Sequence, residues 1–237
     1  MRGPEFSGPF CWFCTKMSSM CALASTLLTN RTYFTLPAVL FALALACYAN
    51  SFPGAFIVDD VSIVQTNPLG VSLDVRSIIT SDYWGIATNS GLYRPLTILS
   101  LAYNHLLLGP EAWGYHLVNA LLHGTVVVFL YFVALELALP LGAAFIAAAL
   151  FAVHPIHTEV VNVIVGRSEL LVALFGLAAL WLGRRGKGWC WWFPAAFCFF
   201  LALLSKEHAV VLLVAIPLID YFFAYSAKGL WRESRHY

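Results

Sequence analysis

The sequence predicts an all-α, polytopic membrane protein with about six transmembrane helices. Hydrophobic residues make up 61% of the 237 residues, charged residues make up 11%, and the mean hydropathy is +0.80. A soluble domain is usually about 45–50% apolar and about 25% charged, so this composition is typical of membrane proteins. The net charge of +1 provides no basic field that would attract a nucleic acid.

Six apolar segments are candidate membrane spans. They are Tyr33–Tyr48, Trp113–Leu139, Leu141–Val153, Leu170–Leu182, Trp189–Leu204 and Ala209–Tyr225. Several are shorter than the roughly 20 residues that a bilayer requires, and the flanking Trp, Tyr and His residues make up most of the difference. The shorter apolar segment Pro95–Leu108 carries Thr97, Ser100 and Asn104 on one helical face. That pattern predicts a helix lying in the membrane interface and not a further span.

The positive charges between the apolar segments predict the orientation. They precede the first span, separate the fourth from the fifth and follow the sixth: Lys16, Arg31, Arg184, Arg185, Lys187, Lys228, Arg232 and Arg235. Because positive loops stay in the cytoplasm, and because six spans put all three regions on one side, both termini are predicted to be cytoplasmic. The chain then divides into a cytoplasmic segment 1–32, a membrane domain 33–225 with a long non-cytoplasmic loop 50–93, and a cytoplasmic tail 226–237.

Ionisable residues gather on the opposite, non-cytoplasmic face. They are Asp59, Asp60, Arg94, His154, His157, Glu159, Arg167, Lys206, Glu207 and His208. Asp59 and Asp60 directly follow the first span, where a carboxylate can take a proton from a hydroxyl nucleophile. Neighbouring side chains of an extended segment point to opposite sides, so only one of the two would face a substrate. The alternative is an acidic turn in water, since helix ends at a membrane surface have to be polar.

The stretch FAVHPIHTE places His154 and His157 around a proline at the end of an apolar run. HxxH can supply two metal ligands, but the HExxH spacing is missing and the proline prevents a regular helix, so zinc is disfavoured. We expect a phosphate site formed by the two histidines and Arg167, because a guanidinium pairs with phosphate oxygens and a helix N-terminus attracts anions. Lys206 and His208 add positive charge on the same face. The alternative is that each histidine caps a backbone carbonyl.

The second predicted span carries polar residues on one face. His116, Asn119 and His123 follow the i, i+3, i+7 spacing of a helix. Such residues face the interior of a bundle or a wet cavity. The two interpretations, hydrogen bonds that hold the bundle together and contact with a ligand, both remain open at this point.

Five motifs occur in an order that resembles a known enzyme family. They are FIVDD (Phe56–Asp60), YRPLTILS (Tyr93–Ser100), WGYHLVNALLH (Trp113–His123), LFAVHPIHTEVVNVIVGRSELL (Leu150–Leu171) and SKEH (Ser205–His208). Together, from about Tyr33 to Tyr221, they resemble the transmembrane and TPR-repeat-containing protein mannosyltransferases. FAVHPIHTE followed by VGR is highly specific, whereas FIVDD and RPLT are weaker alone.

The resemblance implies a GT-C-like, multi-pass glycosyltransferase of the endoplasmic reticulum membrane. Such an enzyme transfers mannose from dolichyl-phosphate mannose to Ser or Thr hydroxyls of secretory-pathway proteins, cadherins among them. It implies that an acidic residue of the first luminal loop, here Asp59 or Asp60, is the acid/base group. We expect the donor phosphate to be bound by Arg94, His154, His157, Arg167, Lys206 and His208. No cofactor is implied, and a requirement for a divalent metal stays open.

The family also carries further membrane helices and a long array of TPR repeats, which this sequence does not contain up to Tyr237. We therefore expect a short isoform, a fragment or an incomplete gene model. The alternative function is a non-catalytic membrane scaffold or a regulatory short form. A transporter is disfavoured, because the loop 50–93 is long and the sequence shows no internal repeat.

Overall fold

The computed structural model describes residues 31–85, 89–185 and 189–233, and the regular secondary structure in these ranges is entirely helical. The chain divides into two units between Val39 and Leu40. In the first unit the described part is the beginning of α2 (Arg31–Tyr48). The second unit starts at Leu40 and contains every contact discussed below. The predicted cytoplasmic segment 1–32 lies outside the described residues, apart from the first two residues of α2.

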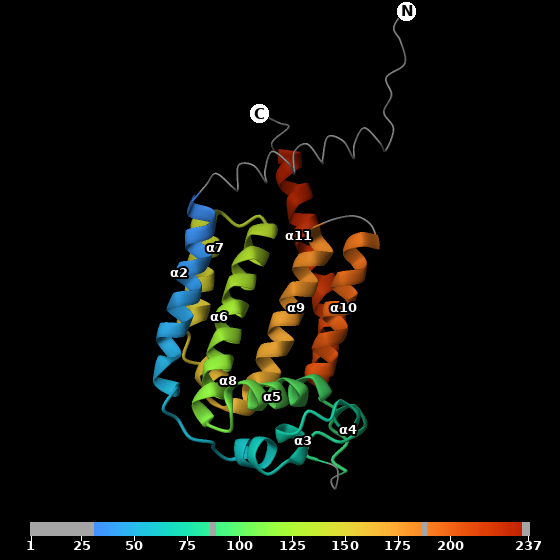
Figure 1. Ribbon diagram of the computed structural model, residues 1–237. Helices are drawn as coiled ribbons and strands as arrows, with labels where there is room; N and C mark the ends of the chain where they lie inside the picture. The colour runs from blue at the N-terminus through green and yellow to red at the C-terminus, as the bar shows by residue number, and fades with distance from the viewer. Residues whose placement is uncertain (1–30, 86–88, 186–188, 234–237) are drawn as a thin grey trace, which may run out of the picture. The chain divides into compact units, whose positions relative to one another are not determined.

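The long helices of the second unit run alongside one another (Figure 1). They are α6 (Ala112–Glu136), α7 (Leu141–Val153), α9 (Arg167–Arg185), α10 (Trp189–Ser205) and α11 (Leu212–Glu233). Helix α6 packs against α7 and α9, and α9 packs against α10. Within the described residues, Ala112–Glu136 and Ile164–Arg185 are long and apolar enough to cross a membrane. The shorter apolar helices are Thr35–Ser51, Pro95–Leu108, Leu141–Val153 and Cys190–Ser205.

Helix α5 and several short helices lie at the end of the unit where α9 begins and α10 ends (Figure 1). They are η1 (Ala49–Ser51), η2 (Val61–Gln65), α3 (Pro68–Val71), α4 (Val75–Thr80), α5 (Pro95–Leu108), α8 (His157–Asn162), η3 (Ile164–Gly166) and η4 (Glu207–Val211). Local sequence explains their ends. The side chains of Asn67 and Asp74 cap α3 and α4, and Pro95 occupies the first turn of α5. Gly109, with φ of 82°, terminates α5 in a conformation that favours glycine.

Close packing of α6 against α7 depends on small side chains. Ala144, Ala148 and Ala152 recur every fourth residue on one face of α7, and all three are fully buried. Small residues at this spacing let two helix backbones approach each other, as in membrane bundles. A second cluster, which includes Ile98, Leu101 and Tyr115, joins α5 to the short helices and to the start of α6.

Helix α5 has the predicted bounds, and its polar face turns toward the interior of the unit. Thr97 and Asn104 are buried, whereas Leu106 and Leu107 are exposed. The hydroxyl of Thr97 donates to the carbonyl oxygen of Ser205 at 2.8 Å. The polar face turns inward because it supplies hydrogen-bond partners to Arg167 at the start of α9 and to the Ser205 carbonyl at the end of α10. Lipid and apolar side chains could not supply them.

Helix α11 is longer than the predicted sixth span. It continues to Glu233, beyond the expected end of the sixth span at Tyr225. The predicted tail 226–237 is therefore helical over its described part, and residues 234–237 lie outside the described ranges.

Candidate functional site

A cavity of about 490 Å³ lies at the end of the unit formed by the short helices. Its walls come from the loop after α2, the loop between α4 and α5, the start of α5, α8, η3, the first turn of α9 and the turn after α10. The lining residues are Asp59, Tyr83, Trp84, Arg94, Glu159, Val160, Val163, Val165, Gly166, Ser168, Glu169 and Lys206. We call it the ionic cavity. Three of the predicted site residues, Asp59, Arg94 and Lys206, line it together.

Arg94 is held at the cavity wall by Glu207. Its Nε and Nη2 donate to the two carboxylate oxygens of Glu207 at 2.9 Å and 2.5 Å. The guanidinium also lies over the ring of Tyr83, 4.8 Å from the ring centroid. Hydrogen bonding from Arg94 lowers the pKa of Glu207 to about 2, and burial raises the pKa of Tyr83 to about 12. At neutral pH the pair is therefore ionic and the phenol keeps its proton.

Lys206 and His208 share one acidic partner, Glu169, in the first turn of α9. Lys206 Nζ donates to Glu169 Oε1 at 2.5 Å, and His208 Nε2 lies 3.2 Å from Glu169 Oε2. Glu169 lines the ionic cavity, whereas His208 does not. The sequence indicates Lys206 and His208 as cations of the site, and the structure connects both through the carboxylate of Glu169.

The two adjacent aspartates have different surroundings. Asp59 is exposed and lines the ionic cavity. Asp60 is fully buried, and its carboxylate accepts hydrogen bonds from the backbone N–H groups of Val165 at 2.9 Å and Ile57 at 3.3 Å. Burial raises the pKa of Asp60 although these hydrogen bonds oppose the rise. Asp59 is thus the carboxylate available to a ligand, and Asp60 fastens the loop to η3.

Arg167 occupies a different position from the one predicted. It is fully buried, does not line the ionic cavity, and is surrounded by oxygen atoms of α5 and α6. Its N–H groups donate to Asn104 Oδ1 (2.8 Å), Asn119 Oδ1 (2.9 Å), the Tyr115 carbonyl (3.1 Å) and the Ser100 carbonyl (3.2 Å). A guanidinium has five N–H groups, so these four bonds leave little capacity for a phosphate. In this structure Arg167 joins three helices.

His154 and His157 also lie away from the ionic cavity. The ring of His157 packs 4.1 Å from that of Phe151 and 5.3 Å from that of His123, measured between centroids. The Nδ1 atom of His154 accepts a hydrogen bond from the backbone N–H of Ile156 at 3.2 Å. Of the stretch FAVHPIHTE, the residue that lines the cavity is Glu159. The structure thus brings together Asp59, Arg94 and Lys206, and separates the two histidines and Arg167 from them.

The polar face of α6 mainly joins helices. Asn119 Nδ2 donates to the carbonyls of Val161, Val163 and Ile164, and His123 Nε2 lies 3.2 Å from the carbonyl of Ala152. These contacts support the bundle-holding interpretation for both residues. His116 is buried, and its ring lies against the backbone of Gly54 in the segment that follows α2.

Two properties of the ionic cavity depend on the fold and have no signal in the sequence. One is the pairing of acids with cations, because Glu207 and Arg94 are 113 positions apart in sequence. The other is the aromatic wall formed by Tyr83 and Trp84, which belong to a loop without regular periodicity. Among the described residues no group of three or more His, Cys, Asp or Glu side chains could hold a metal ion.

The fold and the cavity define the class of this chain: a helical protein with candidate membrane spans and an ionic pocket where its helices end. Sequence comparison identifies the family. The chain is 37% identical over 190 residues to human protein O-mannosyl-transferase TMTC3, covering 76% of the chain and 21% of that protein. It is 36% identical over 203 residues to mouse TMTC2 (79% and 24%) and 36% identical over 185 residues to mouse TMTC1 (71% and 19%).

These similarities confirm the resemblance to the transmembrane and TPR-repeat-containing mannosyltransferases: the chain is TMTC-like over about three quarters of its length. It spans about a fifth to a quarter of the length of these curated relatives. No family model matches the chain, and no solved structure matches it either.

Proposed function

We propose that this chain forms the sugar-transfer site of a protein O-mannosyltransferase of the endoplasmic reticulum. The observation that carries the proposal is the ionic cavity, whose lining brings the exposed carboxylate of Asp59 together with Arg94 and Lys206. The curated relatives are named protein O-mannosyl-transferases. On this proposal the donor is dolichyl-phosphate mannose, and the acceptors are Ser or Thr hydroxyls of secretory-pathway proteins such as cadherins.

Asp59 is the general base in this scheme. Its carboxylate takes the proton of the acceptor hydroxyl while the hydroxyl oxygen attacks C1 of the mannose. A new C1–O bond forms as the bond from C1 to the phosphate oxygen breaks, and dolichyl phosphate leaves with the bonding electrons. Direct attack inverts the configuration at C1. Exposure of Asp59 in the cavity supports this role, and burial of Asp60 against two backbone N–H groups supports a positioning role for Asp60.

Arg94 and Lys206 are the cations that stabilise the leaving phosphate. Both are already neutralised in the free chain, by Glu207 and Glu169. A phosphate that enters the cavity therefore competes with two carboxylates, and a guanidinium can bind a phosphate oxygen and a carboxylate at once through its separate N–H groups. The carboxylates hold both cationic side chains in place before the donor arrives, which reduces the conformational entropy that these side chains lose when the donor binds.

The membrane arrangement that fits this proposal has six spans. The spans are α2, α6, α7, α9, α10 and α11, in a GT-C-like arrangement, with the ionic cavity at the luminal surface. Helix α9 supports the orientation, because it begins beside the cavity and ends with Arg184 and Arg185. Basic residues at the far end match the rule that positive loops stay in the cytoplasm.

The test is transfer of radiolabelled mannose from dolichyl-phosphate mannose to a Thr-containing acceptor by membranes that contain the protein. Asp59→Asn should lower the rate by about 10²- to 10⁴-fold, as loss of a general base does. Asp74→Asn is the matched control, because Asp74 is also an exposed aspartate and asparagine caps a helix equally well. Unchanged transfer by Asp59→Asn would remove this residue from the mechanism.

One observation favours the alternative of a non-catalytic scaffold: each cation of the cavity already has an acidic partner. On that view the ion pairs only hold the short helices against α9 and α10. Arg94→Ala separates the two functions. It should weaken binding of dolichyl phosphate if the cavity takes the donor, and should change thermal stability alone if the cavity is structural.

A further inference from the structure

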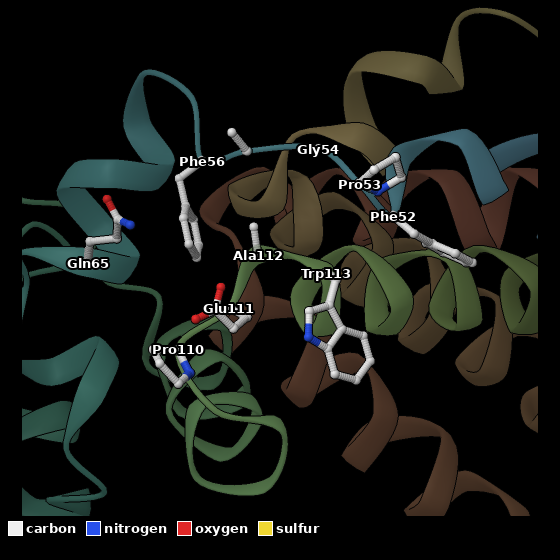
Figure 2. Close-up of a pocket in the computed structure, with 10 residues that line it drawn as sticks. Phe52, Pro53, Gly54, Phe56, Gln65, Pro110, Glu111, Ala112 and Trp113 are labelled. Carbon is white, nitrogen blue, oxygen red and sulfur yellow. The ribbon is translucent and has the colours of Figure 1, made fainter.

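A second cavity, of about 650 Å³, lies between the segment that follows α2 and the start of α6. Figure 2 shows the side chains of Phe56, Gln65, Glu111 and Trp113 around it. We call it the aromatic groove. It shares no lining residue with the ionic cavity, yet its wall at Phe56 is three residues from Asp59 in sequence. Three residues span at most about 11 Å, so the two cavities are close neighbours.

The chemistry of the aromatic groove does not suit a phosphate. Glu111 carries the only charge among its ten lining residues, and none of them is Lys, Arg or His. Phosphate sites in proteins rely on Arg, Lys or a helix N-terminus. Helix α6 does begin at this groove, but the carboxylate of Glu111 at its N-cap repels an anion. Phe52, Phe56 and Trp113 instead offer aromatic surfaces, and Trp113 is 47% exposed. The groove therefore fits a neutral or basic ligand with apolar side chains.

The backbone of the groove wall is available for pairing. The segment from Gly54 to Ile57 is not helical, and the backbone groups of Ala55 and Phe56 make no hydrogen bond with the described residues. Gly54 lies so close to α6 that a Cβ atom there would be 3.0 Å from His116 Nε2. A backbone with free N–H and C=O groups beside side-chain pockets is the arrangement that recognises a polypeptide in an extended conformation.

A strained residue connects the groove to the base. Val58 has φ of 45° and is 82% exposed. A β-branched residue is a genuine outlier in this left-handed region, and such strain concentrates at functional sites. The reversal at Val58 leaves Phe56 in the aromatic groove while Asp59 enters the ionic cavity. A chain bound in the groove would thus pass near the base.

We propose that the aromatic groove binds the polypeptide acceptor, in an extended conformation next to its Ser or Thr. This inference rests on the proposed function, and it adds where the acceptor lies and what it prefers. Backbone groups of Ala55 and Phe56 pair with the acceptor chain, Trp113 packs against an apolar side chain, and Glu111 selects basic over acidic residues beside the acceptor hydroxyl.

The experiment measures binding, so it does not depend on turnover. The probe is a fluorescein-labelled Thr peptide with neutral flanks, with one Lys or with one Glu near the Thr, and the readout is anisotropy with the full chain in detergent. Trp113→Ala should weaken binding of the neutral peptide by about tenfold, the size of effect expected for a central aromatic contact. Tyr103→Ala is the matched control, because Tyr103 is also 47% exposed but lies outside the groove. It should leave binding unchanged.

Charge reversal tests selectivity. Glu111→Lys should weaken binding of the Lys peptide and strengthen that of the Glu peptide, each by about fivefold, as exposed ion pairs allow. Ile79→Lys adds a positive charge at an exposed position outside the groove and should change the affinity for neither peptide. The proposal is overturned if the wild-type chain binds none of the peptides, if groove and control variants behave alike, or if groove variants lose dolichyl phosphate instead of peptide.

Failure of the proposed function would look different. Asp59→Asn should lower the rate of mannose transfer by about 10²- to 10⁴-fold and leave peptide affinity unchanged. If this variant transfers mannose normally, the catalytic assignment is wrong, whereas a peptide affinity that responds to Trp113→Ala and Glu111→Lys still places the peptide in the groove.

Discussion

Replacement of Arg167 by methionine tests the interpretation of the buried network most directly. Methionine is similar in length but leaves four oxygen acceptors on α5 and α6 without their donors. Hydrogen bonds to a charged group contribute about 1.5–3 kcal/mol each, and part of this is offset because a buried charge is removed. We expect a net loss of about 3–5 kcal/mol, or a fall of about 10 °C in the unfolding midpoint for a chain of this size.

The assay is thermal unfolding in mild detergent, followed by the loss of monomer in size-exclusion chromatography. Arg167→Lys keeps the charge but has all its N–H donors on one nitrogen. Its unfolding midpoint should therefore lie between those of the wild type and Arg167→Met. Arg76→Met is the control, because Arg76 is exposed and its replacement should shift the midpoint by no more than about 2 °C. If Arg167→Met unfolds at the same temperature as the wild type but no longer binds dolichyl phosphate, Arg167 is a phosphate ligand and the structural interpretation fails.

Two further predictions follow from the carboxylates. Asp60→Ala removes the acceptor of the Val165 and Ile57 N–H groups, and should lower stability by about 2 kcal/mol in the same thermal assay, whereas Asp60→Asn keeps one oxygen and should lower it less. Equal midpoints for wild type and Asp60→Ala would contradict this role. The pKa of Glu207 is held at about 2 by Arg94, below its usual 4.5, so this pair stabilises the fold fully above about pH 4.5 and loses its contribution as the pH falls toward 2. Between about pH 6 and about pH 3 the unfolding midpoint of Glu207→Gln should change less with pH than that of the wild type. Parallel pH profiles would refute the coupling between Glu207 and Arg94.

The sequence predicts helices well where it contains explicit start and stop signals. Both α5 and α7 have the expected bounds, because Pro95 and Gly109 delimit the first, and the proline pair Pro140 and Pro155 flanks the second. Helix α11 lacks such a stop signal near Tyr225, and its described part runs on to Glu233. Apolar periodicity thus locates a helix, while capping residues are needed to fix its length.

The site was predicted only in part, because adjacency in sequence does not fix which way a side chain points. His154, His157 and Arg167 lie within 14 positions of one another, and this proximity predicts one phosphate site. The decisive partners are distant: the amide oxygens that receive the Arg167 guanidinium are 48 and 63 positions away. No periodicity in one segment reports a partner on another helix. Asp59 and Asp60 show the same limit, since only the fold separates the exposed carboxylate from the buried one.

The buried network and the ionic cavity are mechanically connected. Arg167 is the first residue of α9, and it binds oxygen atoms of α5 and α6. The same α5 begins one residue after Arg94, and the same first turn of α9 contains Glu169, the partner of Lys206. Arg167 therefore sets the relative position of two cavity walls without entering the cavity. This explains why FAVHPIHTE and the VGR that follows it are polar within an apolar chain. Glu159 reaches the cavity, the histidines pack the turn, and Arg167 fixes the helices that hold Arg94 and Glu169 in place.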